Sequence, residues 1–118
     1  MNQPLTPAAH GVADYLSAAT FAAAPALLGL RGTPARLAQG LGAAYAGMSL
    51  ATDYPLGAVR KIPFTAHWTA DAVLAPALAA APWVLGFADD RRARGFFLAM
   101  AAVSAVVTTL TQRRPAYA

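Results

Sequence analysis

The sequence predicts an all-α fold, a four-helix transmembrane bundle built from two tandem helix hairpins with pseudo-twofold symmetry. Charged residues make up only 12% of the 118 residues and hydrophobic residues 58%, whereas roughly 25% of an average soluble protein is charged. A set of His, Asp, Pro and Gly residues also occurs twice at one spacing. The charges are absent from four stretches, which are residues 15–30, 37–52, 72–88 and 95–112.

Each uncharged stretch has between 16 and 18 residues, close to the roughly 20 that cross the hydrocarbon of a bilayer as a helix. The alternative is a soluble, Ala-rich four-helix bundle, which needs a polar stripe along each helix. The segment 96–107 has apolar residues on every side apart from Ser104. The pattern therefore favours one transmembrane domain covering residues 1–118.

Proline and threonine mark the beginnings of the first three helices. Pro7, Pro34 and Pro63 stand where a first helical residue tolerates the missing N–H. Thr6 and Thr33 precede two of them and are predicted N-caps. The helices are expected at approximately 7–30, 34–52, 63–88 and 91–112.

Acidic and basic residues mark the remaining helix ends. Asp89 and Asp90 precede the fourth helix, where carboxylates favour the positive end of the helix dipole. The segment 53–62 begins Asp-Tyr-Pro-Leu-Gly and is predicted to be a turn between the second and third helices. Arg60 and Lys61 close it at the membrane surface.

The internal repeat is the strongest signal in the chain. It predicts repeat 1 at about 7–52 and repeat 2 at about 63–112, both entering the membrane in the same direction. The second helices match less well, with Thr52 and Thr109 among the few identities at this spacing. The residues that match at an offset of 57 are His10 and His67, Asp14 and Asp71, Pro25 and Pro82, and Gly29 and Gly86.

The chain resembles the SPW-repeat family, small prokaryotic membrane proteins named for a Ser-Pro-Trp motif in a two-helix unit. The resemblance lies in residues 81–87, Ala-Pro-Trp-Val-Leu-Gly-Phe, and more weakly in residues 24–30. Ala stands in place of the Ser in both copies, and the first copy lacks the Trp. The resemblance implies the two-copy fold and a multi-pass location in the bacterial inner (cytoplasmic) membrane, but no activity.

Structural roles are expected for the prolines, glycines and tryptophans of the repeat. Pro25 and Pro82 lie in the last turns of their helices, where a missing hydrogen bond bends the chain. The glycines that follow them, Gly29 and Gly86, can end each helix. Trp68 and Trp83, near opposite ends of the third helix, are predicted membrane-interface anchors.

Small residues recur on the second helix at Gly40, Ala43, Ala44 and Gly47. Small residues let helices approach closely in lipid. Packing within the bundle is the favoured interpretation, and a cavity or a contact between copies in a homo-oligomer is the alternative.

His10 with Asp14, and His67 with Asp71, are the residues that can carry chemistry. Residues at i and i+4 share one helix face, so each His can reach its Asp. Intramembrane carboxylates are costly unless paired and mark functional sites. The four side chains are predicted to point into the bundle as one polar cluster, with pairing that ties helices together as the structural interpretation.

A pseudo-twofold also brings the two imidazoles toward one another, which suggests ligand binding. In this interpretation His10 and His67 bind a divalent transition metal or ligate a haem from both sides, while each Asp holds its imidazole in one tautomer. Proton relay is a further option. Three functions therefore stay open: a structural or accessory membrane protein, a metal- or haem-binding redox protein, and a proton-linked transporter.

The charges also bear on partners and topology. The net charge of +4 comes from basic residues near helix ends, which favours lipid headgroups over nucleic acid. With no Cys, no thiolate site is expected. Both termini and the 53–62 loop are expected on one side of the membrane, with no bias that fixes orientation. That side has Arg60, Lys61, Arg113 and Arg114, and the other has Arg31, Arg36, Arg91, Arg92 and Arg94.

Overall fold

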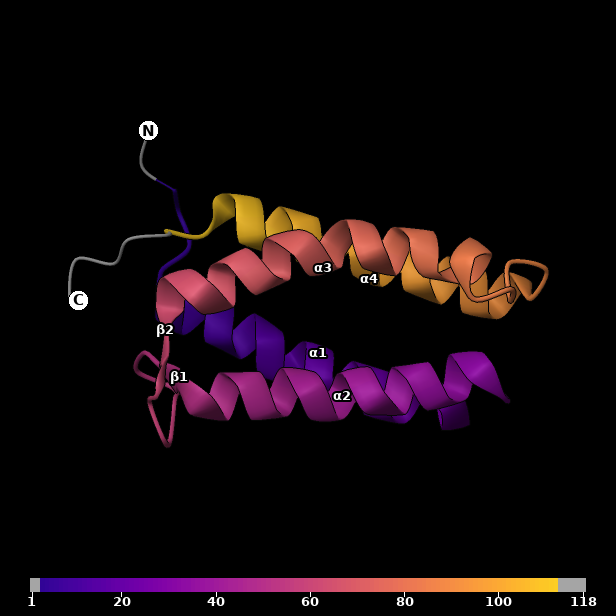
Figure 1. Cartoon of the computed structure of the whole chain (residues 1–118), viewed down its shortest axis with the longest axis horizontal. Coiled ribbons are helices and arrows are strands. Elements are labelled where there is room, and N and C mark those ends of the chain that lie inside the picture. The colour runs from indigo at the N-terminus through magenta and orange to yellow at the C-terminus, as the bar shows by residue number, and fades with distance from the viewer. Residues whose placement is uncertain (1–2, 113–118) are drawn as a thin grey trace.

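The chain is an all-helical bundle of two antiparallel hairpins, seen in a computed structural model that describes residues 3–112. Figure 1 shows the hairpins side by side, and the molecule measures 44 × 29 × 20 Å. The helices lie close together within each hairpin, and fewer backbone contacts join the two hairpins. The elements are α1 (Pro7–Leu28), α2 (Thr33–Ala51), β1 (Thr52–Asp53), β2 (Ile62–Pro63), α3 (Phe64–Val84) and α4 (Arg91–Leu110).

Two of the predicted helix caps are confirmed. The side chain of Thr6 accepts a hydrogen bond from the backbone N–H of Ala9 at 3.1 Å. Asp90 accepts one from the N–H of Ala93, also at 3.1 Å. Each bond satisfies a first-turn donor that has no partner inside the helix, so these residues fix where α1 and α4 begin.

Two other predicted helix starts are wrong by one residue. Thr33 lies inside the first turn of α2, and the residue before it, Gly32, is the N-cap with a φ of 63°. A side chain is strained at that φ, which explains why glycine occupies the position. Pro63 is the N-cap of α3 and not its first helical residue, since its backbone is extended with a ψ of 142°.

The first helix of each hairpin ends in the same way, and earlier than predicted. Gly29 has a φ of 67°, and the N–H of Leu30 donates to the carbonyl of Pro25 at 3.0 Å. At an offset of 57 the N–H of Phe87 donates to the carbonyl of Pro82 at 2.8 Å, and the glycine between them has a φ of 78°. This left-handed termination stops α1 and α3 before residues 30 and 88.

Buried positions correspond between the hairpins at two different offsets. Those of α1 and α3 correspond at 57, as the sequence repeat predicts. Those of α2 and α4 correspond at 59, because the loop 85–90 is two residues longer than the loop 29–32. Matching Thr52 with Thr109 is therefore wrong, and Thr111 is the equivalent of Thr52. The other pairs are Pro34 and Ala93, Ala38 and Phe97, Gly42 and Ala101, and Ser49 and Thr108.

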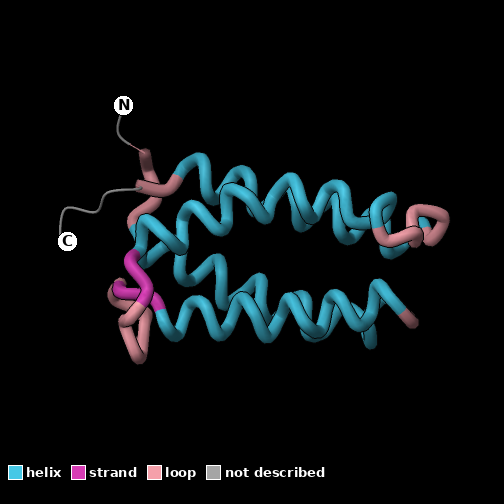
Figure 2. The backbone as a smooth tube through the Cα atoms, viewed as in Figure 1, coloured by secondary structure: helices cyan, strands magenta, loops and turns pink. Residues whose placement is uncertain are grey.

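Short strand contacts join the end of each hairpin to the beginning of the other. β1 and β2 are parallel with Thr52 opposite Ile62, and an isolated parallel bridge places Leu5 opposite Thr111. Figure 2 shows the strand pair at the end of the bundle where α1 begins and α4 ends. The described termini and the 53–62 loop therefore share one end, while Arg113 and Arg114 lie outside the described residues.

The hairpins enclose an aromatic core, and small residues pack against it at a different place from the one predicted. Phe21 and Phe97 are fully buried at its centre. A Cβ built on Gly42 would lie 3.0 Å from the carbonyl oxygen of Ala18, so α1 and α2 approach closely there. Among the described residues, and apart from the adjacent backbone of α2 itself, no atom comes within 4 Å of such a Cβ on Gly40 or Gly47, so no other helix packs against these two positions.

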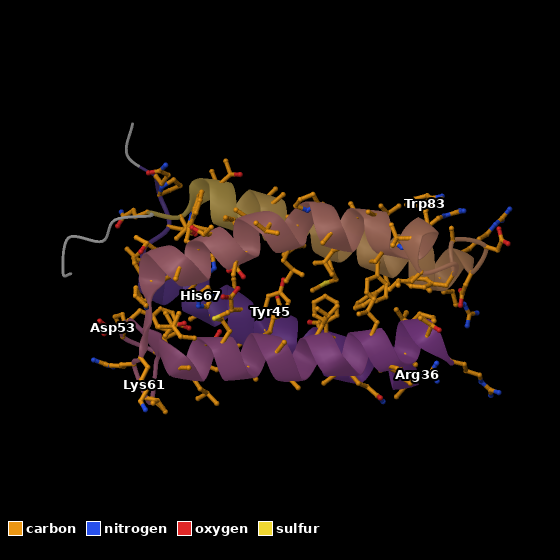
Figure 3. All side chains as sticks on the ribbon, viewed as in Figure 1. Arg36, Tyr45, Asp53, Lys61, His67 and Trp83 are labelled. Carbon is orange, nitrogen blue, oxygen red and sulfur yellow. The ribbon has the colours of Figure 1, made fainter. Side chains whose placement is uncertain are left out.

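The surface between the two ends of the bundle is largely apolar. Leu16, in the middle of α1, is 64% exposed and Val73, in the middle of α3, is 65% exposed, while charged side chains gather at the two ends (Figure 3). Within the described part of the chain, α1 and α4 are long and apolar enough to cross a membrane. Trp83 is exposed, whereas Trp68 donates from its indole N–H to the carbonyl of Thr108 at 2.9 Å and so joins α3 to α4.

Candidate metal centre

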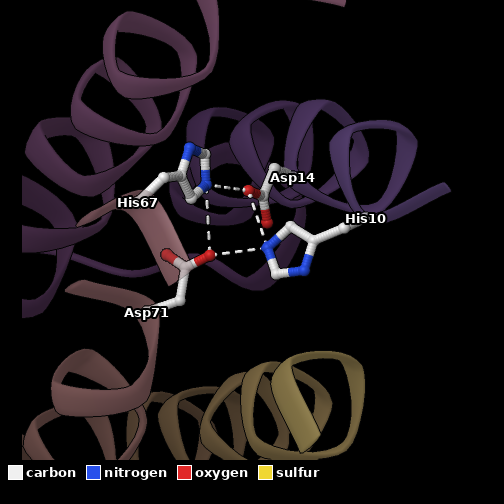
Figure 4. A group of neighbouring side chains, drawn as sticks. All are labelled: His10, Asp14, His67 and Asp71. Carbon is white, nitrogen blue, oxygen red and sulfur yellow. Dashed lines mark hydrogen bonds and ion pairs between the residues drawn. The ribbon is translucent and has the colours of Figure 1, made fainter. Parts of the chain in front are cut away.

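The structure brings together the four ionisable residues that the sequence singles out. His10 and Asp14 come from α1, and His67 and Asp71 from α3; all four are buried. One ligand atom from each residue can be chosen so that all four atoms lie within 4.8 Å of one another. Figure 4 shows the side chains converging between the helices, and we refer to them as the His–Asp cluster.

The shorter contacts in the cluster run between the hairpins. Nε2 of His10 lies 2.6 Å from Oδ2 of Asp71, and Nε2 of His67 lies 2.5 Å from Oδ2 of Asp14. The contacts within each helix, from His10 to Asp14 and from His67 to Asp71, are both 3.2 Å. The i, i+4 pairing expected from the sequence is present, but each His contacts the Asp of the other repeat more closely.

Two threonines hold the other nitrogen of each imidazole. Nδ1 of His10 lies 2.8 Å from Oγ1 of Thr111, and Nδ1 of His67 lies 2.7 Å from Oγ1 of Thr52. Both threonines are completely buried at the C-terminal ends of the second helices. Each His is therefore held by two residues of the other repeat, one Asp and one Thr.

The threonine hydroxyls determine which imidazole nitrogen carries a proton. Thr52 donates its hydroxyl hydrogen to the carbonyl of Met48, and Thr111 donates to the carbonyl of Val107, both at 2.5 Å. A hydroxyl has a single hydrogen, so each Oγ1 must accept from Nδ1–H of its histidine. The contacts thus give threonine a part in orienting each imidazole, which the sequence interpretation assigns to aspartate alone.

This tautomer leaves both Nε2 atoms facing carboxylate oxygens. If Nε2 carries no proton, its lone pair lies within 3.2 Å of an oxygen that also carries lone pairs, which is repulsive unless a proton or a cation lies between them. The cluster therefore needs either shared protons or a metal ion. Its four inward-facing atoms, two nitrogens and two oxygens, are a ligand set that suits zinc.

Aromatic rings cover the cluster toward the strand end of the bundle. Phe64 stacks on His67 at 5.8 Å and meets His10 edge-on at 5.6 Å between ring centroids. Tyr54 stacks on Phe64 at 5.7 Å, and burial raises the pKa of its hydroxyl to about 12. These rings limit water at the cluster, which strengthens electrostatic interactions inside it.

Sequence reasoning missed Thr52 and Thr111 as members of the site. A signal was present, since each is the threonine that directly follows a second helix. In the structure each is the C-cap of that helix and has an extended backbone. The single offset of 57 hid it, because the longer second loop shifts the equivalence to 59. Allowing a gap in the repeat alignment would have paired the two threonines.

The fold and the site define a small helical protein in which two equivalent hairpins share a buried His–Asp cluster. No family model, curated protein or solved structure matches this chain. Resemblance to the SPW-repeat family thus remains an expectation from residues 24–30 and 81–87.

Proposed function

We propose that the chain is a four-span membrane protein of the SPW-repeat type, with its hairpins related by a pseudo-twofold axis along the membrane normal. The apolar surface of the bundle and the absence of charge from 15–30, 37–52, 72–88 and 95–112 support four spans. α1 and α4 meet the length and hydropathy required of a span. α2 and α3 pack against them as hairpin partners, so all four would enter the bilayer together.

We further propose that the His–Asp cluster binds one divalent transition-metal ion. The observation that carries this proposal is the pair of Nδ1–H bonds to Thr52 and Thr111. Metal-binding histidines commonly donate their second ring N–H to a fixed acceptor, which orients the ring and sets the tautomer. Here that arrangement turns both Nε2 lone pairs toward one point beside two carboxylates.

Charge balance also supports a divalent ion. With Nδ1 protonated on both rings, the two short contacts between Nε2 and Oδ2 each require a shared proton, and two such protons make the cluster neutral. Replacing two protons with one divalent cation keeps it neutral. Neutrality matters because an uncompensated charge at this depth is expensive.

Zinc is the ion that this ligand set favours. Zinc takes imidazole nitrogen and carboxylate oxygen at about 2.0–2.2 Å in a tetrahedron, which corresponds to about 3.3 Å between ligand atoms. The two contacts within helices are already 3.2 Å. The two contacts between the hairpins must lengthen by less than 1 Å from 2.6 and 2.5 Å.

The other sequence-based functions receive less support. A haem needs its macrocycle between the two imidazoles, where Oδ2 of Asp14 and Oδ2 of Asp71 contact both Nε2 atoms. Transporter sites usually lie near the bilayer midplane, whereas His67 of this cluster lies toward the strand end of the bundle (Figure 3). A structural role is compatible with a metal, because the ligands come from both hairpins and binding would join them.

Metal titration of the purified protein tests the proposal. Protein in detergent, stripped with a chelator, should bind one Zn²⁺ per chain by calorimetry and elemental analysis, with release of about two protons. Thr52→Val keeps the side-chain shape but removes the Nδ1 acceptor, so zinc affinity should fall about 10- to 100-fold.

Thr69→Val is the matched control. Thr69 lies exposed on α3, and its hydroxyl makes the same kind of bond, to the carbonyl of Thr65 at 2.8 Å, away from the cluster. Zinc affinity should be unchanged in this variant. If wild-type protein binds no divalent transition metal, or binds it equally well after His10→Leu, the metal proposal is wrong and a structural role remains.

A further inference from the structure

A cavity of about 170 Å³ lies beside the His–Asp cluster, between α2 and α3. His67 and Asp71 form part of its wall. Ala44 is exposed, so the cavity opens at the seam between the two helices. The rest of its lining is apolar or aromatic and consists of Ala44, Tyr45, Met48, Ala70 and Leu74.

The other hairpin junction, between α4 and α1, carries an equivalent cavity that is nearly filled. Its volume is about 10 Å³, room for about one water molecule. The lining residues of the two cavities correspond at an offset of 57 between α1 and α3 and of 59 between α2 and α4. Two of them differ in size or polarity: Val103 takes the place of Ala44, and Ser17 takes the place of Leu74. Two related sites have therefore diverged, one toward a small polar pocket and one toward an open apolar cavity.

The size and lining of the larger cavity indicate what it can hold. An apolar cavity of about 150 Å³ in another protein binds benzene, so 170 Å³ fits one aromatic ring with a small substituent. Met48 offers a thioether, which makes favourable contacts with aromatic rings. Entry from the lipid is direct in a membrane-embedded bundle, because the opening lies between two helices.

One polar group in the wall selects among such molecules. Asp71 contacts both histidines through Oδ2, and Figure 4 shows its other oxygen directed away from the cluster. Because Asp71 lines the cavity, a hydroxyl group bound there can donate to its carboxylate, whereas a lipid chain offers the carboxylate no donor. Hydrogen bonds to charged groups are worth about 1.5–3 kcal/mol, enough to favour a hydroxylated ring over a plain one by about tenfold or more.

We propose that the cavity between α2 and α3 binds a lipophilic, single-ring aromatic molecule with a hydroxyl group, the phenol class, whose hydroxyl donates to Asp71. The ring lies among Met48, Ala70 and Leu74. The membrane location is taken from the proposed function, but binding does not require the metal, since the acceptor oxygen is not the one that faces the histidines. Phenol binding and zinc binding can thus fail independently.

Ligand-observed NMR with phenol and benzene tests this proposal on the full chain in detergent, with empty micelles as blank. Phenol should bind with a dissociation constant about tenfold or more below that of benzene, with and without zinc. Ala44→Leu should weaken phenol binding at least about tenfold, because the added atoms fill the opening. Ala43→Leu, on the neighbouring exposed residue outside the cavity, should bind as wild type.

A second filling variant, Leu74→Phe, covers the case in which Ala44→Leu does not fold, and should weaken phenol binding to a similar degree. Equal affinity for benzene and phenol would overturn the hydroxyl assignment and indicate an apolar occupant such as a lipid chain. Unchanged phenol binding in a folded filling variant would place the ligand elsewhere and overturn the proposal. Loss of zinc binding alone leaves it intact.

Discussion

The pairing within the His–Asp cluster can be tested by removing the same residue types in two different combinations. His10→Leu combined with Asp71→Leu removes one short pair that joins the hairpins. His10→Leu combined with Asp14→Leu instead removes the pair within α1. Both double variants replace one His and one Asp by Leu, so the change in side-chain volume is matched.

The expected difference follows from the distances. The first double variant leaves His67 and Asp14 together at 2.5 Å. The second leaves His67 with only the 3.2 Å contact to Asp71 and removes both short contacts. A buried polar group that loses its partner costs about 1–3 kcal/mol, so the second variant should be less stable than the first by about that amount.

The free energy of unfolding in mixed micelles measures the difference, and a double-mutant cycle with the single variants isolates the pair energy. Asp71→Ala alone should cost about 1–3 kcal/mol, because Nε2 of His10 keeps only Asp14 at 3.2 Å. The first double variant should be more stable than this single one. If the two double variants prove equally stable, or the pair within α1 is the less costly to remove, the pairing between hairpins does not organise the site.

Two further predictions concern packing and topology. Gly11→Ala should lower the free energy of unfolding by about 1–3 kcal/mol, because its Cβ would lie 2.5 Å from Cε2 of Tyr54; Gly47→Ala, with open space around it, should leave stability unchanged or raised. Cysteines introduced at Arg31 and Lys61 should react with an impermeant thiol reagent from opposite sides of the membrane. Reaction from one side only would rule out the four-span arrangement.

Much of the fold could be predicted because short sequence patterns mark where the helices begin and which helices correspond. Pro, Thr and Asp mark helix starts, and an offset of 57 between the two copies of His, Asp, Pro and Gly relates α1 to α3. The first helix of each hairpin was predicted too long, to residues 30 and 88, because the charge-free stretches that set these bounds run past the glycines expected to end it, Gly29 and Gly86. That termination depends on backbone geometry, which apolar periodicity does not contain.

The four residues of the His–Asp cluster were predicted, but the shorter contacts between the hairpins were not. The i, i+4 spacing shows only which residues share a helix face, and therefore suggested His10 with Asp14. Contacts between the hairpins depend on how far apart their helices lie, which is set by side chains such as Phe21 and Phe97 in the core between them. Thr52 and Thr111 were missed for the related reason that loop length, and not local pattern, determines which residues of the second helices meet the histidines.

Corresponding positions of the two hairpins differ in how strongly their contacts constrain them. The His and Asp residues of the cluster lie where the hairpins meet, and each hairpin supplies hydrogen-bond partners to the other. A substitution in one hairpin therefore leaves buried polar groups in both hairpins without a partner. Positions that face only one junction, such as Leu74 and Ser17, carry no such constraint, because each contacts its own surroundings. Differences between the hairpins are therefore expected in the cavities and not in the cluster, and the proposed ligand site lies on one side of a centre that both hairpins share.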